Sequence, residues 1–283
     1  MSAPIPKLAP IPRLAGVCGW PIHHSLSPAL HTHWLRELGV RGAYVPFLVR
    51  PDEAVAAFRS LPRTSIAGLN VTLPLKRSAW EAADRRTPAA ETLGVANLLY
   101  RDGKALVADN TDMEGFLAPL RSRLGADALG QTTAVVVGAG GAARAAVGAL
   151  VGAGVPEVRL LARRDAQAVE LADTQSLPSV HAAQWSRRAD TLRGAGLIVN
   201  ATSAGMVGKP VLDLPLTQAE PGALAYDLVY TPRKTPFLRE ASARGLRTLD
   251  GLEMLVAQAR PSFRRFFGVD APDGGLDVLD ALL

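Results

Sequence analysis

The sequence is poor in several features, and each shortage excludes a class of protein. Cys18 is the only cysteine among 283 residues, so no internal disulfide can form and a reducing compartment is expected. No uncharged apolar run is long enough for a membrane span, so no membrane partner is expected. The proline-spaced residues 1–12 lack the apolar core of a signal peptide. Together these observations predict a cytoplasmic location.

Aromatic residues and blocks of basic residues are also scarce. The formal net charge is +5, but aromatic residues make up only 5% of the chain and the basic residues are scattered. Proteins that bind nucleic acid usually combine a continuous basic surface with stacking aromatic side chains. The composition therefore argues against a nucleic-acid partner, whereas an anionic small molecule would suit the positive balance.

Lysine is scarce beside arginine, since only five of the 31 basic residues are lysines. Lysine can give up its proton in a suitable environment near neutral pH, whereas arginine cannot. One lysine, Lys76, ends the segment Asn70-Val71-Thr72-Leu73-Pro74-Leu75-Lys76, which places amide and hydroxyl side chains after an apolar run. Taken alone, this segment could be only a strand end followed by a helix start with a solvated Lys76.

Short apolar runs alternate with helical patterns throughout the chain. The first part predicts strands over 14–18, 43–49 and 66–71, helices over 27–38, 51–61 and 75–83, and an edge hairpin from 95–100 and 105–108. After a predicted helix over 112–124, strands are expected at 133–137, 158–162, 197–200 and 223–229. Further helices are expected up to 153 and over 236–244, 252–267 and 276–283. This order predicts two α/β domains, 1–112 and 113–250, with mainly parallel sheets.

A glycine-rich turn follows the apolar strand predicted at 133–137. Gly138-Ala139-Gly140-Gly141-Ala142-Ala143 fits the dinucleotide-binding pattern G-x-G-x-x-A in its required context between a strand and a helix. The helix amides and the helix dipole would hold the phosphates. Arg163 and Arg164 follow the next strand, where an acid would indicate NAD, and they favour the 2′-phosphate of NADP. Asp165, just beyond them, is expected to cap the next helix.

Other polar residues precede predicted helices. Ser25 and Ser27 could bind one anion at a helix N-terminus, although Ser27 could also be a simple cap. Asp112 could likewise be only a cap, and Asn97 is a polar residue in an apolar run that needs a partner. No cysteine or carboxylate cluster joins the neighbouring histidines, so no metal site is expected; these histidines are His23, His24, His31 and His33.

Six motifs occur together in one order along the chain. They are the segments 19–28 (GWPIHHSLSP), 70–76 (NVTLPLK), 110–112 (NTD), 138–143 (GAGGAA), 200–206 (NATSAGM) and 250–258 (DGLEMLVAQ). With these motifs the chain resembles the shikimate dehydrogenase family over nearly its whole length. The resemblance implies an NADP-dependent, reversible reduction of 3-dehydroshikimate to shikimate, a step in aromatic amino acid biosynthesis. It also implies a Rossmann-type cofactor domain over 113–250 and a substrate domain over 1–112 that 251–283 complete, because the C-terminal helix returns to it.

The resemblance also implies roles for individual residues. Lys76 and Asp112 match the catalytic pair, in which Lys76 exchanges a proton with the substrate oxygen and Asp112 orients it. The implied substrate ligands are Ser25, Ser27, Asn70, Thr72, Asn97, Tyr230 and Gln258. The implied cofactor ligands are Gly138, Ala139, Gly140, Gly141, Ala142, Arg163, Arg164, Thr202, Met206 and Gly251.

One departure from the family pattern bears on cofactor choice. The family's usual Asn-Arg-Thr after the second cofactor strand is Ala162-Arg163-Arg164 here. An NAD-preferring quinate/shikimate dehydrogenase is therefore an alternative, against which both arginines argue. A non-catalytic, nucleotide-sensing binding protein is another, against which the presence of both Lys76 and Asp112 argues. The sequence leaves a homodimer open.

Overall fold

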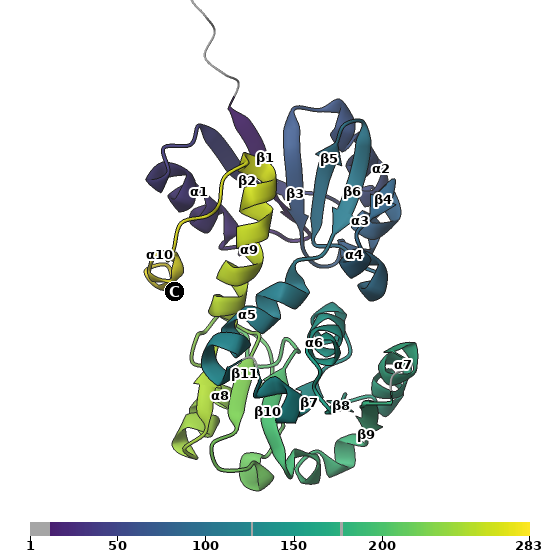
Figure 1. The fold of residues 1–283 in the computed structure, drawn as a ribbon, viewed down its shortest axis with the longest axis vertical. Coiled ribbons are helices and arrows are strands. Elements are labelled where there is room, and N and C mark those ends of the chain that lie inside the picture. The colour runs from purple at the N-terminus through teal and green to yellow at the C-terminus, as the bar shows by residue number, and fades with distance from the viewer. Residues whose placement is uncertain (1–11, 126, 176–177) are drawn as a thin grey trace, which may run out of the picture.

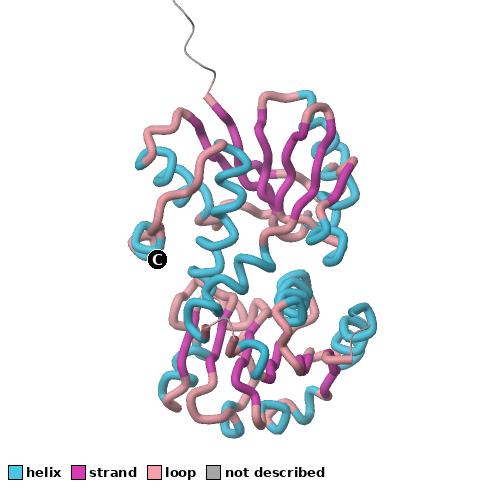
Figure 2. The backbone as a smooth tube through the Cα atoms, in the orientation of Figure 1, coloured by secondary structure: helices cyan, strands magenta, loops and turns pink. Residues whose placement is uncertain are grey.

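The computed structural model describes residues 12–125, 127–175 and 178–283, so the proline-spaced residues 1–11 lie outside the described residues. Within these ranges the chain forms two six-stranded sheets, each with helices packed against it (Figure 1). Figure 2 shows the strands as two separate groups, with helices and loops running between them. The predicted class with two α/β units is confirmed. None of the helices in the described ranges has the length and apolar character needed to cross a membrane.

The first sheet has the strand order β2-β1-β3-β5-β6-β4. Its strands are β1 (Arg13–Gly19), β2 (Gly42–Leu48), β3 (Ile66–Val71), β4 (Arg85–Arg86), β5 (Leu98–Asp102) and β6 (Ala105–Asp109). β1 pairs in parallel with β2 and β3, whereas β5 runs antiparallel to β3 and β6. The predicted hairpin is present, but its expected place at the edge is wrong because the two-residue β4 pairs with the outer side of β6.

The helices of the first part lie close to their predicted positions. They are α1 (Ser27–Glu37), α2 (Ala54–Ser60), α3 (Lys76–Ala82) and α4 (Pro88–Leu93). Only α4 was not predicted, although its boundaries carry ordinary signals. The Thr87 side chain accepts a hydrogen bond from the Ala90 amide, Pro88 lies in the first turn, and Gly94 ends the helix at φ +63°.

The second sheet has the order β12-β11-β10-β7-β8-β9, and all its strand pairs are parallel. Its strands are β7 (Thr133–Val137), β8 (Glu157–Leu161), β9 (Val180–Ala183), β10 (Ala195–Asn200), β11 (Leu224–Asp227) and β12 (Arg247–Leu249). The helices between them are α6 (Gly141–Gly152), α7 (Asp165–Gln175) and α8 (Pro236–Ala243). Numbered from β7, the strand order is 3-2-1-4-5-6, which is the doubly wound dinucleotide-binding arrangement.

Two helices lie where the sheets approach each other, α5 (Asp112–Leu124) and α9 (Gly251–Phe267) (Figure 1). α9 begins beside the second sheet and then packs on the first, where Phe263 and Phe266 are completely buried with Trp34 of α1. The last helix, α10 (Leu276–Asp280), continues from α9 and adds Leu279 to the same core. The C-terminal segment therefore joins the first sheet, as predicted.

Candidate active site

Polar side chains gather at one end of the first sheet, where β3 and β6 end and β5 begins. Asn70 pairs in register with Leu98, and Leu98 pairs with Asp109 on its other side. The segment that follows β3 leads to Lys76 at the start of α3, and the segment that follows β6 leads to Asp112 at the start of α5. Strand register therefore brings together two motifs that are far apart in the sequence.

Lys76 and Asp112 form a partly buried ion pair. The Nζ atom of Lys76 donates to Oδ2 of Asp112 at 2.6 Å, and the side chains are 18% and 10% exposed. Thr111 occupies the N-cap position of α5, so the interpretation of Asp112 as a simple cap is wrong. As the first residue of α5, Asp112 also lies at the end of the helix dipole that favours a carboxylate. The Asp112 carboxylate therefore balances the charge of the Lys76 ammonium and holds it in place.

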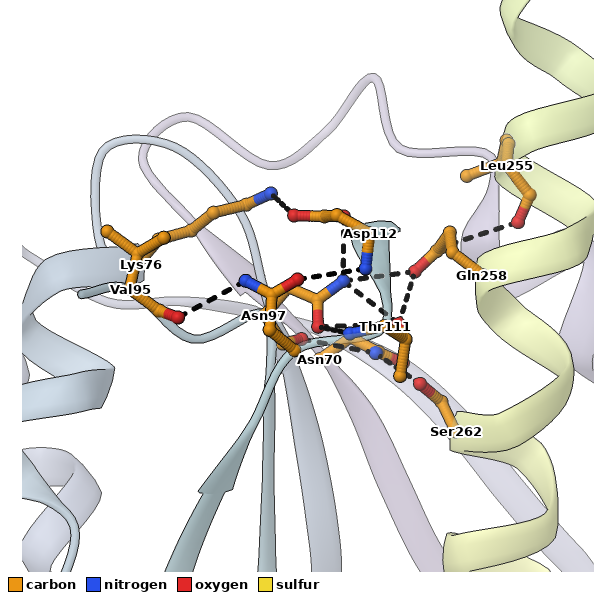
Figure 3. A network of polar contacts seen from close by, with 10 residues as sticks. Asn70, Lys76, Val95, Asn97, Thr111, Asp112, Leu255, Gln258 and Ser262 are labelled. Carbon is orange, nitrogen blue, oxygen red and sulfur yellow. Dashed lines mark hydrogen bonds and ion pairs between the residues drawn. The ribbon is translucent and has the colours of Figure 1, made fainter. Parts of the chain in front are cut away.

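Asn97 supports the carboxylate from the other side. Its Nδ2 donates to Oδ1 of Asp112 at 2.8 Å and to Oγ1 of Thr111 at 3.0 Å, and its Oδ1 accepts from the Thr111 amide at 2.8 Å. Figure 3 shows Asp112 between Lys76 and Asn97, with Gln258 reaching in from α9. The Oε1 atom of Gln258 lies 3.4 Å from the Thr111 hydroxyl. The polar residue noted in an apolar run thus finds its partners at the start of α5.

Asn70 lies behind this group, and the two polar atoms of its buried side chain both form hydrogen bonds. Its Oδ1 accepts from the Tyr44 hydroxyl at 2.7 Å, and its Nδ2 donates to Oγ of Ser262 at 2.8 Å and to the Asn97 carbonyl oxygen at 3.2 Å. Tyr44, Thr111 and Ser262 were not predicted as site residues. Ser262 stands four residues after Gln258, on the same face of α9, and that spacing was its available signal.

The remaining predicted substrate ligands come from the start of α1 and from the segments that follow β3 and β11. Ser27 opens α1 and has an exposed fraction of 7%, but Leu26 holds the N-cap position, so Ser27 lies one residue inside the helix. The interpretation of Ser27 as a cap is therefore wrong. The Thr72 methyl group faces Gly19 at the end of β1, and Tyr230 follows β11 and packs against the core that α9 shares with the first sheet. Burial raises the pKa of the Tyr230 phenol, which keeps it protonated.

The histidines do not form a metal cluster. Among the described residues, no three histidine, cysteine, aspartate or glutamate side chains are placed to hold a metal ion. His31 is completely buried and stacks on the Tyr44 ring at 3.9 Å, while His33 lies 3.2 Å from Glu37.

The glycine-rich turn has the shape that a pyrophosphate requires. Gly138 adopts φ +127°, and a Cβ there would stand 2.9 Å from the Ala201 carbonyl oxygen. At Gly140 and Gly141, which begin α6, a Cβ would meet no atom within 4 Å. The first amides of α6 have no partner inside the helix and face a position that a ligand can approach. The residues of this turn therefore fit a dinucleotide.

The other predicted cofactor residues lie around the edge of the second sheet. Arg163 and Arg164 follow β8, and both side chains are exposed. Thr202 lies beside the turn, because a Cβ at Gly138 would stand 3.3 Å from its Cγ2. Asp165 does not cap α7 as expected, since it is the first residue of the helix and its Oδ1 accepts from the Trp185 amide at 2.8 Å.

Two further predicted cofactor residues, Met206 and Gly251, lie in the segment after β10 and at the first position of α9. Met206 is half-buried in the segment after β10. Gly251 begins α9, where a Cβ would stand 2.2 Å from the Leu228 carbonyl oxygen. Close packing of the backbone therefore requires glycine at 251, whatever binds nearby.

The fold and the site define a dinucleotide-binding protein with a lysine–aspartate pair at the end of its first sheet. Comparison with known proteins agrees. Residues 17–99 match the model of the shikimate dehydrogenase substrate binding domain, and residues 251–274 match that of the shikimate 5'-dehydrogenase C-terminal domain. A protein of Paracoccus denitrificans named shikimate dehydrogenase (NADP(+)) is 45% identical over 283 residues, which cover 100% of this chain and 99% of the relative. The chain belongs to the shikimate dehydrogenase family.

Solved structures give the same result. Shikimate 5-dehydrogenase of Thermus thermophilus, in complex with NADP(H) and shikimate, has a TM-score of 0.84 and 33% identity, and the match covers 96% of this chain and 100% of that chain. The enzyme of Listeria monocytogenes, in complex with shikimate and NAD, has a TM-score of 0.85 and 28% identity, with 98% of each chain covered.

Gly115 controls how closely α5 and α9 approach at the site, which gives a first prediction. A Cβ at this position would stand 2.5 Å from Cβ of Gln258 and 3.0 Å from its Cα. We therefore expect Gly115→Ala to lower the free energy of unfolding by about 1–3 kcal/mol, the usual cost of overpacking. Urea denaturation measures this change.

The matched control for Gly115→Ala is Gly152→Ala at the end of α6, where a Cβ would meet no atom within 4 Å. This variant should be at least as stable as the wild type. If the two variants had equal stability, the steric interpretation of Gly115 would be wrong.

Proposed function

We propose that this protein catalyses the reversible, NADP-dependent reduction of 3-dehydroshikimate to shikimate, with Lys76 and Asp112 as the catalytic pair. The observation that carries the proposal is their partly buried contact of 2.6 Å, at the end of the sheet that matches the substrate-binding family model. The protein is an oxidoreductase of the family whose relatives are named for NADP. In this proposal 1–112 with 251–283 bind the substrate and 113–250 bind the cofactor.

The chemistry divides between cofactor and protein. When bound, NADPH supplies the hydride for the keto carbon. Lys76 donates the proton that the carbonyl oxygen needs as negative charge develops on it, a contribution of roughly 10²- to 10⁴-fold in rate. Asp112 holds the Lys76 ammonium in place, and Asn97 holds Asp112 through its other carboxylate oxygen. In the reverse direction neutral Lys76, or its pair with Asp112, would accept the proton of the substrate hydroxyl.

The other site residues bind and orient the substrate. The hydroxyls of Ser25 and Ser27 would hold the substrate carboxylate at the start of α1, where the helix dipole favours an anion. Tyr230 would approach the same carboxylate, and the ring hydroxyls would contact Thr72, Asn97 and Gln258. A cytoplasmic location and a homodimer remain predictions.

An absorbance assay at 340 nm tests the proposed reaction. The purified protein is mixed with shikimate or quinate and with NADP or NAD, and formation of the reduced cofactor is followed. We expect the highest kcat/KM for shikimate with NADP. Higher kcat/KM for quinate with NAD would favour the quinate/shikimate alternative. No turnover in any of the four mixtures would favour a nucleotide-sensing binding protein.

The exposed pair Arg163 and Arg164 gives a second prediction, on cofactor choice. An arginine beside the adenosine ribose can form charge-assisted, bidentate bonds to a 2′-phosphate, whereas NAD offers only a hydroxyl there. We expect replacing both arginines by alanine to lower kcat/KM for NADP at least about tenfold and to leave that for NAD nearly unchanged, since a charged hydrogen bond contributes about 1.5–3 kcal/mol.

The matched control is Arg187→Ala. Arg187 is an exposed arginine within 113–250, the proposed cofactor domain. This variant should leave the kcat/KM values for NADP and NAD unchanged. If the double variant at 163 and 164 kept its preference for NADP, the assignment of these arginines would be wrong.

A further inference from the structure

Tyr44 of β2 lies behind the substrate site and contacts it through one hydroxyl group. Its exposed fraction is 3%, and its OH donates to Oδ1 of Asn70 at 2.7 Å. Burial raises the Tyr44 pKa well above its ordinary value, so the phenol stays protonated and remains a donor. The other face of Tyr44 contacts α1, because His31 of this helix stacks on the tyrosine ring. Tyr44 thus links Asn70 to the helix that Ser27 opens.

The hydrogen bonds of Asn70 define what this residue can do. An amide side chain has two N–H groups, and those of Asn70 both have acceptors, Oγ of Ser262 and the Asn97 carbonyl oxygen. Rotating the amide by half a turn would place Oδ1 against that carbonyl oxygen, two acceptors facing each other. The amide orientation is therefore determined, and Asn70 has no N–H group left for a ligand. At most, it accepts one hydrogen bond through Oδ1.

The tyrosine ring is itself held firmly. His31 stacks on it with ring centroids 3.9 Å apart and an interplanar angle of 10°, and Phe266 lies at 6.2 Å. Burial lowers the pKa of His31 to about 3, so the stacked ring is neutral at ordinary pH. Hydrogen bonds connect Tyr44, Asn70 and Ser262, which come from β2, β3 and α9. With the stacked His31, one connected line of side chains joins α1 to the helix that carries Gln258.

We propose that Tyr44 is a positioning residue for the substrate: its hydroxyl fixes the Asn70 amide and its ring packs on His31 of α1, and so it sets the separation between the carboxylate-binding serines at the start of α1 and the Asn97–Asp112 group. This proposal rests on the proposed function. Tyr44 does not touch the reacting atoms. Its removal should therefore affect substrate binding more than the chemical step, and it should not affect the cofactor.

The test compares Tyr44→Phe with the wild type. Removing the hydroxyl leaves Oδ1 of Asn70 buried without its donor, while the stacked ring remains. We expect the KM for shikimate to rise about tenfold, kcat to fall less than about threefold, and the KM for NADP to stay unchanged. The matched control is Tyr226→Phe, because the buried Tyr226 hydroxyl has no hydrogen-bond partner among the described residues. That variant should keep all three constants.

A second variant, Ser262→Ala, tests the route through Asn70. This test can be made even if the Tyr44→Phe protein does not fold. Ser262→Ala removes the acceptor of the same amide and should also raise the KM for shikimate. If both act through Asn70, the double variant should raise KM by less than the product of the single effects. If the KM increase of the double variant equalled the product of the two single increases, the two residues would not act through Asn70, and the shared route would be wrong.

Different results would contradict the proposed function and the positioning role of Tyr44. If the wild type does not oxidise shikimate, the proposed function is wrong. If the wild type does so and folded Tyr44→Phe keeps its KM for shikimate within twofold, or if the KM values for shikimate and NADP rise together, the positioning role of Tyr44 is wrong.

Discussion

Lys76→Ala is expected to lower kcat for shikimate at least about a hundredfold, while the KM for shikimate changes less than about threefold. A proton donor acts mainly in the transition state, where charge develops on the substrate oxygen, so its loss appears in kcat. The contact of 2.6 Å with Asp112 fixes the ammonium at the place where Asn97 and Gln258 also converge. Steady-state kinetics at 340 nm with saturating NADP measure both constants.

Two further variants make the Lys76 prediction sharper. Lys76→Arg keeps the positive charge but cannot give up a proton near neutral pH, so it should be nearly as slow as Lys76→Ala if proton transfer is the function of this residue. Lys104→Ala, in the exposed turn between β5 and β6, is the matched control and should keep normal turnover. Normal turnover in a folded Lys76→Ala protein, checked by thermal unfolding, would refute the assignment.

The long elements were predictable because their patterns are local. β3 over Ile66–Val71, β7 over Thr133–Val137 and α5 over Asp112–Leu124 have the predicted boundaries. Each combines an apolar run or a helical period with clear residues at its ends. The strands that were missed, β4, β9 and β12, contain two, four and three residues. Such segments are too short to show a period, and only pairing with a neighbouring strand makes them strands.

The site was predictable where its residues stand in motifs or interrupt a pattern. Lys76, Asp112 and Gln258 stand in motifs, and Asn97 is a polar residue in an apolar run. The structure brings these four residues together. Tyr44 and Ser262 were not expected because they contact Asn70 across 26 and 192 residues of sequence. Nothing local distinguishes a tyrosine in a strand that packs only in the core from one whose hydroxyl reaches an amide.

Three local interpretations failed for a related reason. Ser27, Asp112 and Asp165 all lie where a helix begins, and the preference of serine and aspartate for N-caps suggested that role. In each case the residue is already the first residue of its helix, and the Asp165 carboxylate binds the Trp185 amide. A preference for caps cannot distinguish adjacent positions at a helix start, but that shift by one residue decides where the side chain points.

The double variant Ser25→Ala/Ser27→Ala is expected to raise the KM for shikimate about a hundredfold or more. Each lost hydrogen bond to a charged carboxylate costs roughly 1.5–3 kcal/mol, and about 3 kcal/mol in total corresponds to that factor. The two residues are placed together, since the Ser27 amide donates to Oγ of Ser25 at 3.4 Å and Ser27 begins α1. kcat should fall much less, because the carboxylate is not at the reacting carbon.

An analogue of shikimate with a neutral carboxamide separates carboxylate binding from general damage to the site. The wild type should bind this analogue more weakly than shikimate, because the hydroxyls and the α1 dipole favour a negative charge. The double variant should lose far less affinity for the analogue than for shikimate. Ser60→Ala, which removes an exposed hydroxyl at the end of α2, is the matched control and should leave both affinities unchanged. Equal losses for the charged and the neutral ligand would mean that the two serines shape the pocket without binding the carboxylate.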